Sequence, residues 1–395
     1  MKTRYHTIFL PVSFLAVILL VVDSTARADH PSIAFGGGGS GPINAVSAST
    51  LPEGKWASSL RVELLDFDRY NNAQLERFGL KGIHADSVDY SLGAFASLGY
   101  GLTDNITVGM RLPYFYTDDI REPEEEFGII EVANEGDAAG LGDILFMSVL
   151  RLHEDEARKL TISAITGLEM PTGYYKARND EGDLFELEHQ PSSNSWDPIV
   201  GLALRKGFDR WSFHSSATFM FVTEGAYHTN LGDVCNYNAA VVFHLLGDTH
   251  DHSHMDGFPT IGPSGVRQAS YFDDGADHDH DGHDHGDHDH SNHDHNQSSG
   301  GSDDNQSHEH DDTHRGASLD GILEMNGIWE GKDFIGGVRD NDSGGNVIYL
   351  APGLRLTFNE RTSCFVSTGF PIIQNVNGAN HRVEFRLVVG TAITY

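Results

Sequence analysis

The sequence predicts an all-β fold: a transmembrane, antiparallel, up-and-down β-barrel of about twelve strands with a long disordered insert rich in histidine and aspartate. Three observations predict it. The chain ends in a strand of alternating character, RVEFRLVVGTAITY, whose last residue is the aromatic Tyr395. It begins with an export signal. Between the two lie alternating segments separated by turn signals.

The last strand, residues 382–395, has one apolar face and one wetter face. Every second residue back from Tyr395 is apolar or β-branched, and the interleaved row becomes polar towards Arg382. Successive side chains of a strand point to opposite faces, so this pattern suits a sheet between lipid and water. A final aromatic residue resembles the C-terminal signal of bacterial outer-membrane barrels. The competing interpretation is an edge strand of a soluble sheet.

The first 28 residues are predicted to form a secretory signal peptide. Lys2 and Arg4 precede an apolar run, Ile8–Val22, and a small-x-small cleavage site ends at Ala28. The apolar run is too short for a membrane helix, and no later run is long enough. A membrane location therefore requires a closed barrel, since only helices and closed barrels satisfy every backbone group in lipid.

Composition narrows the partners. The formal net charge is −32, which excludes nucleic acid as a natural partner. Two cysteines, Cys235 and Cys364, are expected at opposite ends of the barrel. That separation exceeds the Cα distance of about 7 Å that a disulfide tolerates, so both are predicted to be free.

The predicted layout has four parts after the signal peptide. Residues 29–54 are a Gly-rich periplasmic arm or a plug of the lumen, and these alternatives stay open. Residues 55–247 carry strands one to eight, residues 248–315 are a disordered periplasmic insert, and residues 316–395 carry strands nine to twelve. The strands are predicted at 55–67, 86–102, 105–118, 140–152, 158–171, 194–207, 210–224, 234–247, 316–332, 346–358, 361–374 and 380–395.

The connections support this layout. Short polar links such as Thr103-Asp104-Asn105 alternate with long acidic or Gly-rich links at 68–85, 119–139, 172–193 and 333–345. Outer-membrane barrels have an even strand count, short periplasmic turns and longer external loops, so both termini should be periplasmic. A soluble sandwich predicts no such alternation.

The polar rows of the strands should face a wet interior. A charge facing lipid near the midplane would cost about 2–4 kcal/mol. The residues predicted to line the lumen are Arg61, Glu63, Arg111, Glu169, Arg205, Arg355 and Arg386. They could set a preference for anions, or simply supply the polar lining that any water-filled barrel needs.

The insert carries the strongest chemical signal, because it holds fourteen of the 23 histidines. Imidazole is the commonest metal ligand of proteins and suits Zn, Cu, Ni and Co. The predicted ligands are His250, His252, His254, His278, His280, His283, His285, His288, His290, His293, His295, His308 and His310. The competing interpretation is an acidic linker that titrates with pH.

A second metal hypothesis concerns the barrel wall. If strands seven and eight pair as a hairpin around residues 225–233, residue numbers of partners sum to about 458, and His214 faces His244. Two opposed imidazoles near the periplasmic mouth could share one ion received from the insert. Two unrelated lumen histidines are the alternative, because register can slip by two residues.

Several segments resemble a known family. GYGLTDNITVGMRLPYFY (99–116), GLGDILFMSVLR (140–151), GLEMPTG (167–173), DPIVGLALR (197–205) and SGGNVIYLAPGLRLTFNERTSCFVSTGFPI (343–372) are similar to outer-membrane transporter-like proteins of the MetA-pathway of phenol degradation family. The resemblance spans most of residues 40–395 and implies an outer-membrane channel, with small aromatic molecules as candidate solutes. It implies no site residues, and the His-rich insert departs from its pattern.

These observations predict a channel of the bacterial outer membrane that passes small solutes passively and whose His-rich arm binds transition metal ions. Expected partners are outer-membrane lipid, small solutes, metal ions and a periplasmic metal-handling protein; no cofactor is required. The alternatives are a channel for small aromatic or hydrophobic compounds with an incidental insert, and a metal-binding surface protein anchored by a barrel. Catalysis is not expected, because the nearest His/Ser cluster, His214-Ser215-Ser216, points to alternating faces.

Overall fold

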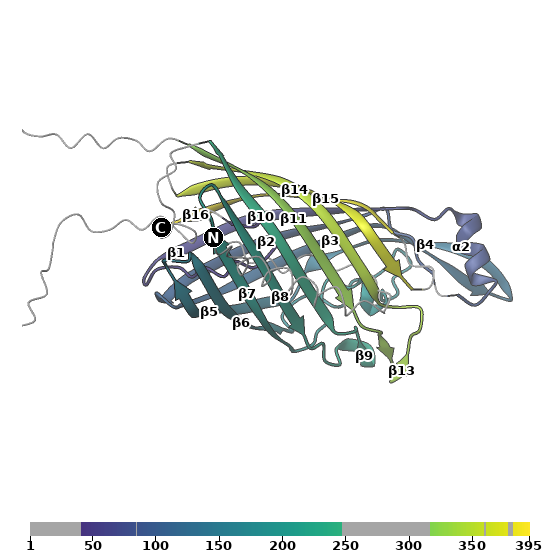
Figure 1. Ribbon diagram of the computed structural model, residues 1–395. Coiled ribbons are helices and arrows are strands. Elements are labelled where there is room, and N and C mark those ends of the chain that lie inside the picture. Colours follow the sequence, from purple (N-terminus) through teal and green to yellow (C-terminus); the bar gives the residue numbers. More distant parts are fainter. Residues whose placement is uncertain (1–40, 84, 247–316, 359–360, 378–381) are drawn as a thin grey trace, which may run out of the picture. The chain divides into compact units, whose positions relative to one another are not determined.

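A closed antiparallel barrel forms the described part of the chain (Figure 1). The computed structural model describes residues 41–83, 85–246, 317–358, 361–377 and 382–395. Within them, twelve strands close the barrel: β1 (Trp56–Phe67), β2 (Tyr90–Thr103), β3 (Ile106–Glu126), β5 (Ile144–Asp155), β6 (Leu160–Met170), β7 (Asp197–Gly207), β8 (Trp211–Met220), β10 (Val234–Leu246), β11 (Ser318–Glu330), β14 (Gly345–Phe358), β15 (Thr362–Val376) and β16 (Val383–Thr394).

Each barrel strand pairs with its neighbours in chain order, and β16 returns to β1. The closing register runs from Ala57 opposite Thr394 to Leu65 opposite Arg386. The backbone N–H of Tyr395 donates to the carbonyl oxygen of Trp56 at 2.9 Å and completes this seam. The predicted fold class is confirmed, and each of the twelve predicted segments overlaps one barrel strand.

The barrel wall has reversed polarity compared with a soluble protein. In β1, Leu60 and Val62 are 62% and 38% exposed on the outer side, whereas Arg61 and Glu63 between them are 7% and 2% exposed. Such an arrangement places apolar side chains against lipid and charges inside. Leu65 and Phe67 continue the inner row.

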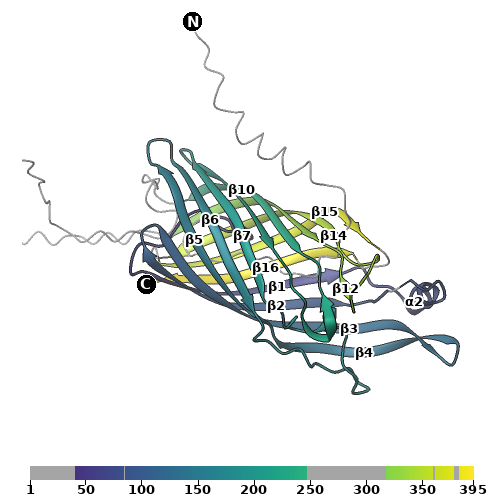
Figure 2. The ribbon, with the colours of Figure 1, turned by 90° about the horizontal axis from the view of Figure 1, so that it is seen from below.

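One predicted loop is wrong. Residues 119–139 were expected to be irregular, but β3 continues to Glu126 and pairs with β4 (Ile129–Leu141) in a hairpin that projects beyond the barrel (Figure 2). The hairpin turns at Phe127 and Gly128, both with positive φ. β-Branched residues at 129, 130 and 132 favour the strand despite the acidic composition.

A helix lies beside this hairpin, α2 (Asn72–Gly79). Asn71 caps it by accepting a hydrogen bond from the N–H of Gln74, whose side chain bonds back to the N–H of Asn71. Leu75 is its buried anchor and packs with Ala85 and Val132. Sequence alternation alone did not reveal α2.

Two short 3₁₀ turns, η1 (Leu187–His189) and η2 (Ala226–His228), belong to other connections at the same end of the barrel. A small separate sheet of β9 (Thr229–Asn230), β12 (Phe334–Ile335) and β13 (Val338–Arg339) joins two further loops there. The opposite end carries the short turns between β2 and β3, β5 and β6, and β7 and β8. By the rule for outer-membrane barrels, that short-turn end is periplasmic.

Residues 41–52, here named the lumen segment, precede β1 and lie inside the barrel. Seven of the first eight, including Ile43, Val46 and Ala48, are buried.

Cys235 and Cys364 are both free, on β10 and β15, which β11 and β14 separate in the sheet. Among the described residues, no helix is long and apolar enough to cross a membrane. The predicted signal peptide and the His-rich insert lie outside the described residues.

Candidate functional site: an occupied lumen

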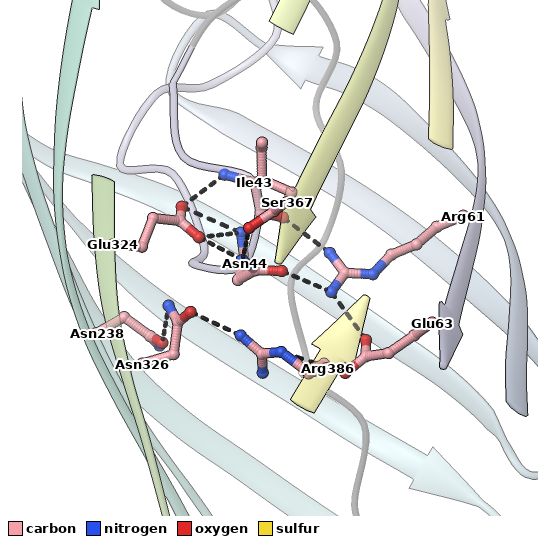
Figure 3. Close-up of polar contacts among 9 residues, drawn as sticks. All are labelled: Ile43, Asn44, Arg61, Glu63, Asn238, Glu324, Asn326, Ser367 and Arg386. Atoms are coloured by element: carbon pink, nitrogen blue, oxygen red, sulfur yellow. Dashed lines mark hydrogen bonds and ion pairs between the residues drawn. The ribbon is translucent and has the colours of Figure 1, made fainter. Parts of the chain in front are cut away.

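A belt of buried charged and amide side chains crosses the lumen (Figure 3). Arg61 Nη2 lies 2.8 Å from Glu63 Oε2, and Glu63 Oε1 lies 3.9 Å from Arg386 Nε. Arg386 on β16 donates to Asn326 Oδ1 on β11 at 2.7 Å, and Asn326 donates to Asn238 on β10 at 3.0 Å. Because β14 and β15 separate β16 from β11, this contact bridges the interior rather than following the wall.

Glu324 of β11 holds the tip of the lumen segment. Its carboxylate accepts the backbone N–H of Ile43 at 2.6 Å, the backbone N–H of Asn44 at 3.0 Å and the Asn44 side-chain amide at 2.5 Å. The same amide donates to Ser367 Oγ at 3.2 Å. Charge-assisted hydrogen bonds of this kind are about twice as strong as neutral ones.

Two arginines bind the carbonyl oxygens of the same tip. Arg355 donates to the carbonyls of Gly41 at 2.7 Å and Pro42 at 3.2 Å. Arg61 donates to the carbonyl of Ile43 at 2.8 Å and to Asn44 Oδ1 at 2.9 Å. The fixed fork of the guanidinium suits such paired acceptors, so two of the predicted lumen arginines serve as clamps on the chain's own backbone.

The lumen segment is also anchored nearer β1. Ser163 of β6 donates to the carbonyl of Ala48, and Thr107 of β3 accepts the N–H of Leu51 at 2.6 Å. Thr50 donates to the carbonyl of Asp104 in the β2–β3 turn at 2.6 Å. The segment therefore enters from the short-turn end and crosses to the β11–β14 wall.

The other end of the lumen is narrowed by part of the β6–β7 connection, residues 185–195, here named the constriction loop. Phe185, Leu187 and Ser195 are buried. Asp143 tethers the connection: its carboxylate accepts the N–H groups of residues 172 and 173 at 2.8 Å and the hydroxyl of Ser192 at 2.8 Å. Asp197 likewise accepts the hydroxyl of Ser195 at 2.6 Å.

A cavity of about 150 Å³ lies beneath the constriction loop. Its wall combines apolar side chains, among them Phe67, Phe115 and Met220, with the charged Arg111 and Glu169. The guanidinium of Arg111 also stacks on the ring of Phe95, 5.0 Å from its centroid. Both predicted residues thus face one compartment, which could hold a small solute with an apolar body and a polar group.

The remaining predicted lumen residue, Arg205 of β7, lies opposite His214 of β8 in the sheet. Of the seven residues predicted to line the lumen, all except Glu169 are buried by accessible surface: Arg61, Glu63, Arg111, Arg205, Arg355 and Arg386. Arg386 additionally stacks on Tyr349 at 4.4 Å. The structure gathers Arg61, Glu63 and Arg386 in the belt, and Arg355 of β14 lies beside them, bound to the lumen segment.

The predicted His214–His244 pair is wrong in register. His214 lies opposite Ala240, so partners sum to 454 rather than 458. β8 ends at Met220, earlier than predicted. The N–H of Val222 donates to the side chain of Asp233, and the N–H of Thr223 donates to the side chain of Asp197, so neither residue pairs across the hairpin. A shift of four residues separates the two imidazoles along the strands.

Each histidine has a different environment. His214 Nε2 lies 2.9 Å from Ser212 Oγ. His244 lies opposite Asp320 of β11, with 2.9 Å between Nδ1 and Oδ1. They are separate lumen residues and do not form a two-histidine site.

Sequence reasoning missed Glu324, Asn326 and Asp143. Glu324 and Asn326 belong to an inward row of β11 that also includes Asp320 and Glu330, and this alternation was readable from the sequence. Asp143 follows Gly142 directly before β5, where a short polar side chain can accept several backbone N–H groups. Its partners at 2.8 Å, however, lie 29 to 49 residues away in sequence and were not predictable.

Comparison with known proteins agrees with this architecture. No family model and no curated protein matches the sequence. Among solved structures, the crystal structure of an outer membrane channel from Pseudomonas putida F1 is similar, with a TM-score of 0.54 and 13% identity over 90% of this chain and 100% of that one. The chain has the fold of an outer-membrane barrel.

More distant similarities include a FadL homologue from Pseudomonas aeruginosa, with a TM-score of 0.36 and 10% identity over 95% of this chain and 98% of that one. The CymD monoaromatic hydrocarbon channel has a TM-score of 0.35 and 9% identity over 87% of this chain and 88% of that one. The closed barrel with an apolar outer face places this protein in the bacterial outer membrane.

Proposed function

We propose that this protein is an outer-membrane channel for the passive passage of small solutes and that the lumen segment is its closed gate. The observation that carries the proposal is the way the backbone of residues 41–44 is held: Glu324 accepts its N–H groups, and Arg61 and Arg355 donate to its carbonyl oxygens. Water and ions can replace such partners, so the segment can leave without unfolding the wall.

The belt gives the opened lumen a charged lining. Arg61, Arg355 and Arg386 would be exposed to passing solutes once the segment withdraws, against the carboxylates of Glu63 and Glu324. Positive charges in a narrow lumen attract anions or the negative ends of dipolar solutes. A polar, dipolar or anionic small solute is therefore the preferred class.

We further propose that the His-rich segment binds transition metal ions and links passage to metal handling. The support is compositional: repeated His-x-His spacing among aspartates between residues 248 and 315. The described strands β10 and β11, which flank it, end and begin at the short-turn end beside the lumen segment.

A second candidate function is passage of small aromatic or hydrophobic compounds, which the family resemblance implies. The cavity supports it, since Phe67, Phe115, Leu187 and Met220 offer an apolar wall beside Arg111. An aromatic molecule with one polar group would match both kinds of surface. The third interpretation, a barrel that serves only to anchor a metal-binding surface protein, requires no solute passage at all.

Planar-bilayer conductance of the purified full chain separates these possibilities. Wild type should show rare openings, and Glu324→Ala, which removes the carboxylate that accepts hydrogen bonds from residues 43 and 44, should show frequent ones. A change in opening frequency when zinc is added would support coupling to metal. Block of the current by small aromatic acids would support the second candidate. The absence of conductance in both proteins would leave the anchor interpretation.

A further inference from the structure

Three metal-ligating side chains meet at the end of the barrel opposite the short turns. Asp86 lies just before β2, in the connection from β1, and Glu188 and His189 belong to η1 of the constriction loop. One ligand atom from each of the three lies within 4.8 Å of the others. The side chains of Asp86, His189 and Glu188 are 1%, 6% and 12% exposed, so the cluster is enclosed by protein.

The distances suit a tetrahedral metal ion. His189 Nε2 lies 3.3 Å from Asp86 Oδ2 and 3.6 Å from Glu188 Oε1. Oxygen and nitrogen ligands bind zinc at about 2.0–2.2 Å, which places two ligands of a tetrahedron about 3.3–3.6 Å apart. Both separations from the imidazole nitrogen therefore match the edges of such a tetrahedron, and the carboxylates of Asp86 and Glu188 offer ligand atoms within 4.8 Å of each other. A fourth corner remains for water or a solute.

The surroundings are strongly negative. Near the cluster, on the projecting hairpin, the pKa of Glu122 is raised to about 8 by burial and then by the carboxylates of Glu186, Glu135 and Asp86. Each of these neighbours raises the cost of a further negative charge. A divalent cation beside Asp86 would lower that cost, so the charge distribution favours a cation at this place.

We propose that Asp86, Glu188 and His189 form a binding site for a divalent transition-metal ion of the zinc class, which fastens the constriction loop to the β1–β2 connection. An imidazole nitrogen with two carboxylates favours such ions over Mg²⁺ and Ca²⁺, which prefer oxygen ligands alone. The ion would join two connections that are about 100 residues apart in sequence and would hold the loop over the cavity.

This site is distinct from the His-rich segment, since it uses three fixed side chains outside residues 248–315. It also lies at the end of the barrel opposite the one where β10 ends and β11 begins. Binding itself is independent of the proposed channel. Only the expected consequence of binding, a less mobile constriction loop at the channel entrance, rests on the proposed channel function. Glu188 and His189 also line the cavity, so the ion's open corner would face the solute compartment.

Hydrogen–deuterium exchange on the purified full chain, with zinc held by a metal buffer, tests the site peptide by peptide. Buffering keeps free zinc constant whatever the His-rich segment takes up, and site-resolved exchange separates the two regions. At free zinc about ten times the dissociation constant, mass action should slow exchange in residues 184–195 and 85–89 by about tenfold. His189→Gln and Asp86→Asn should abolish this slowing.

His153→Gln is the matched control, because His153 is exposed on β5 at the short-turn end, and it should respond to zinc as wild type does. The same zinc response in wild type and His189→Gln would overturn the site, as would no response in wild type. Protection by Ca²⁺ that survives His189→Gln would also overturn it in favour of a purely acidic site.

If neither variant folds, zinc-edge anomalous diffraction from wild-type crystals decides. Anomalous density in contact with all three side chains would support the site, and the absence of such density would overturn it. Conductance is not measured in either experiment, so a negative result leaves the proposed channel untouched. Conversely, a protein without conductance can still bind zinc here.

Discussion

Removing the Glu324 carboxylate should release the lumen segment. In Glu324→Ala, the backbone N–H groups of Ile43 and Asn44 and the Asn44 side chain lose their acceptor. Hydrogen bonds to a charged group are worth about 1.5–3 kcal/mol each. The three share one carboxylate and are not additive, and the freed groups can bind water, so we expect about 3 kcal/mol in total.

Because about 1.4 kcal/mol corresponds to a factor of ten, the ratio of undocked to docked segment should rise roughly a hundredfold. The assay is single-channel recording in planar bilayers, with the ratio of open to closed time as the readout. Glu324→Gln retains one acceptor oxygen but places an NH₂ group against the remaining donors. Its effect should therefore be intermediate.

The matched control is Glu131→Ala, which removes an exposed carboxylate from β4 on the projecting hairpin and should leave the open ratio unchanged. Heat-modifiable electrophoretic mobility establishes that each variant forms a barrel. An open ratio for Glu324→Ala within twofold of wild type, in a correctly assembled barrel, would refute the reasoning that these hydrogen bonds hold the gate.

Three more results are expected. Deleting Tyr395, or replacing it with Asp, should reduce the heat-modifiable fraction in outer membranes, because both changes remove the terminal aromatic and the deletion also removes the backbone bond to Trp56. Normal assembly of both variants would count against this. Asp143→Ala should speed hydrogen exchange around Ser192 by at least about tenfold, since several hydrogen bonds to one carboxylate are removed, and unchanged exchange would contradict the tether. Burial and neighbouring carboxylates raise the pKa of Glu122 from 4.5 to about 8. The folded hairpin therefore binds the proton more tightly than the unfolded chain and loses stability as pH rises between these values. With a chelator present, opening of the β3–β4 hairpin, measured by hydrogen exchange, should increase over this pH range in wild type and not in Glu122→Gln.

The strands could be predicted because their information is local. Alternation within one strand fixes which side chains face lipid, and Arg61, Arg355 and Arg386 were placed in polar rows for that reason alone. A charge in such a row has no low-energy position on the lipid face. Strand number and inward rows therefore follow from the sequence without knowledge of any contact.

Register and long-range docking could not be read this way. The His214 prediction failed because residues 222 and 223 leave the strand to bind Asp233 and Asp197, a choice made by the loop rather than by alternation. The lumen segment carries no periodic pattern, and its hydrogen-bond partners on the barrel wall lie between 17 and 323 residues away in sequence. The hairpin of β3 and β4 was missed because its acidic composition masked a row of β-branched residues.

The contacts of the lumen segment also constrain the order of assembly. Asn44 is separated by 280 residues from Glu324, and Gly41 by 314 from Arg355. Glu324 and Arg355, on β11 and β14, face the lumen segment across the interior only after β16 has paired with β1 and closed the wall. Contacts of such sequence separation form late, because the entropy of closing so long a chain must be paid first. We therefore expect the wall to close before the lumen segment docks, so that the proposed gate is the last part of the barrel to form.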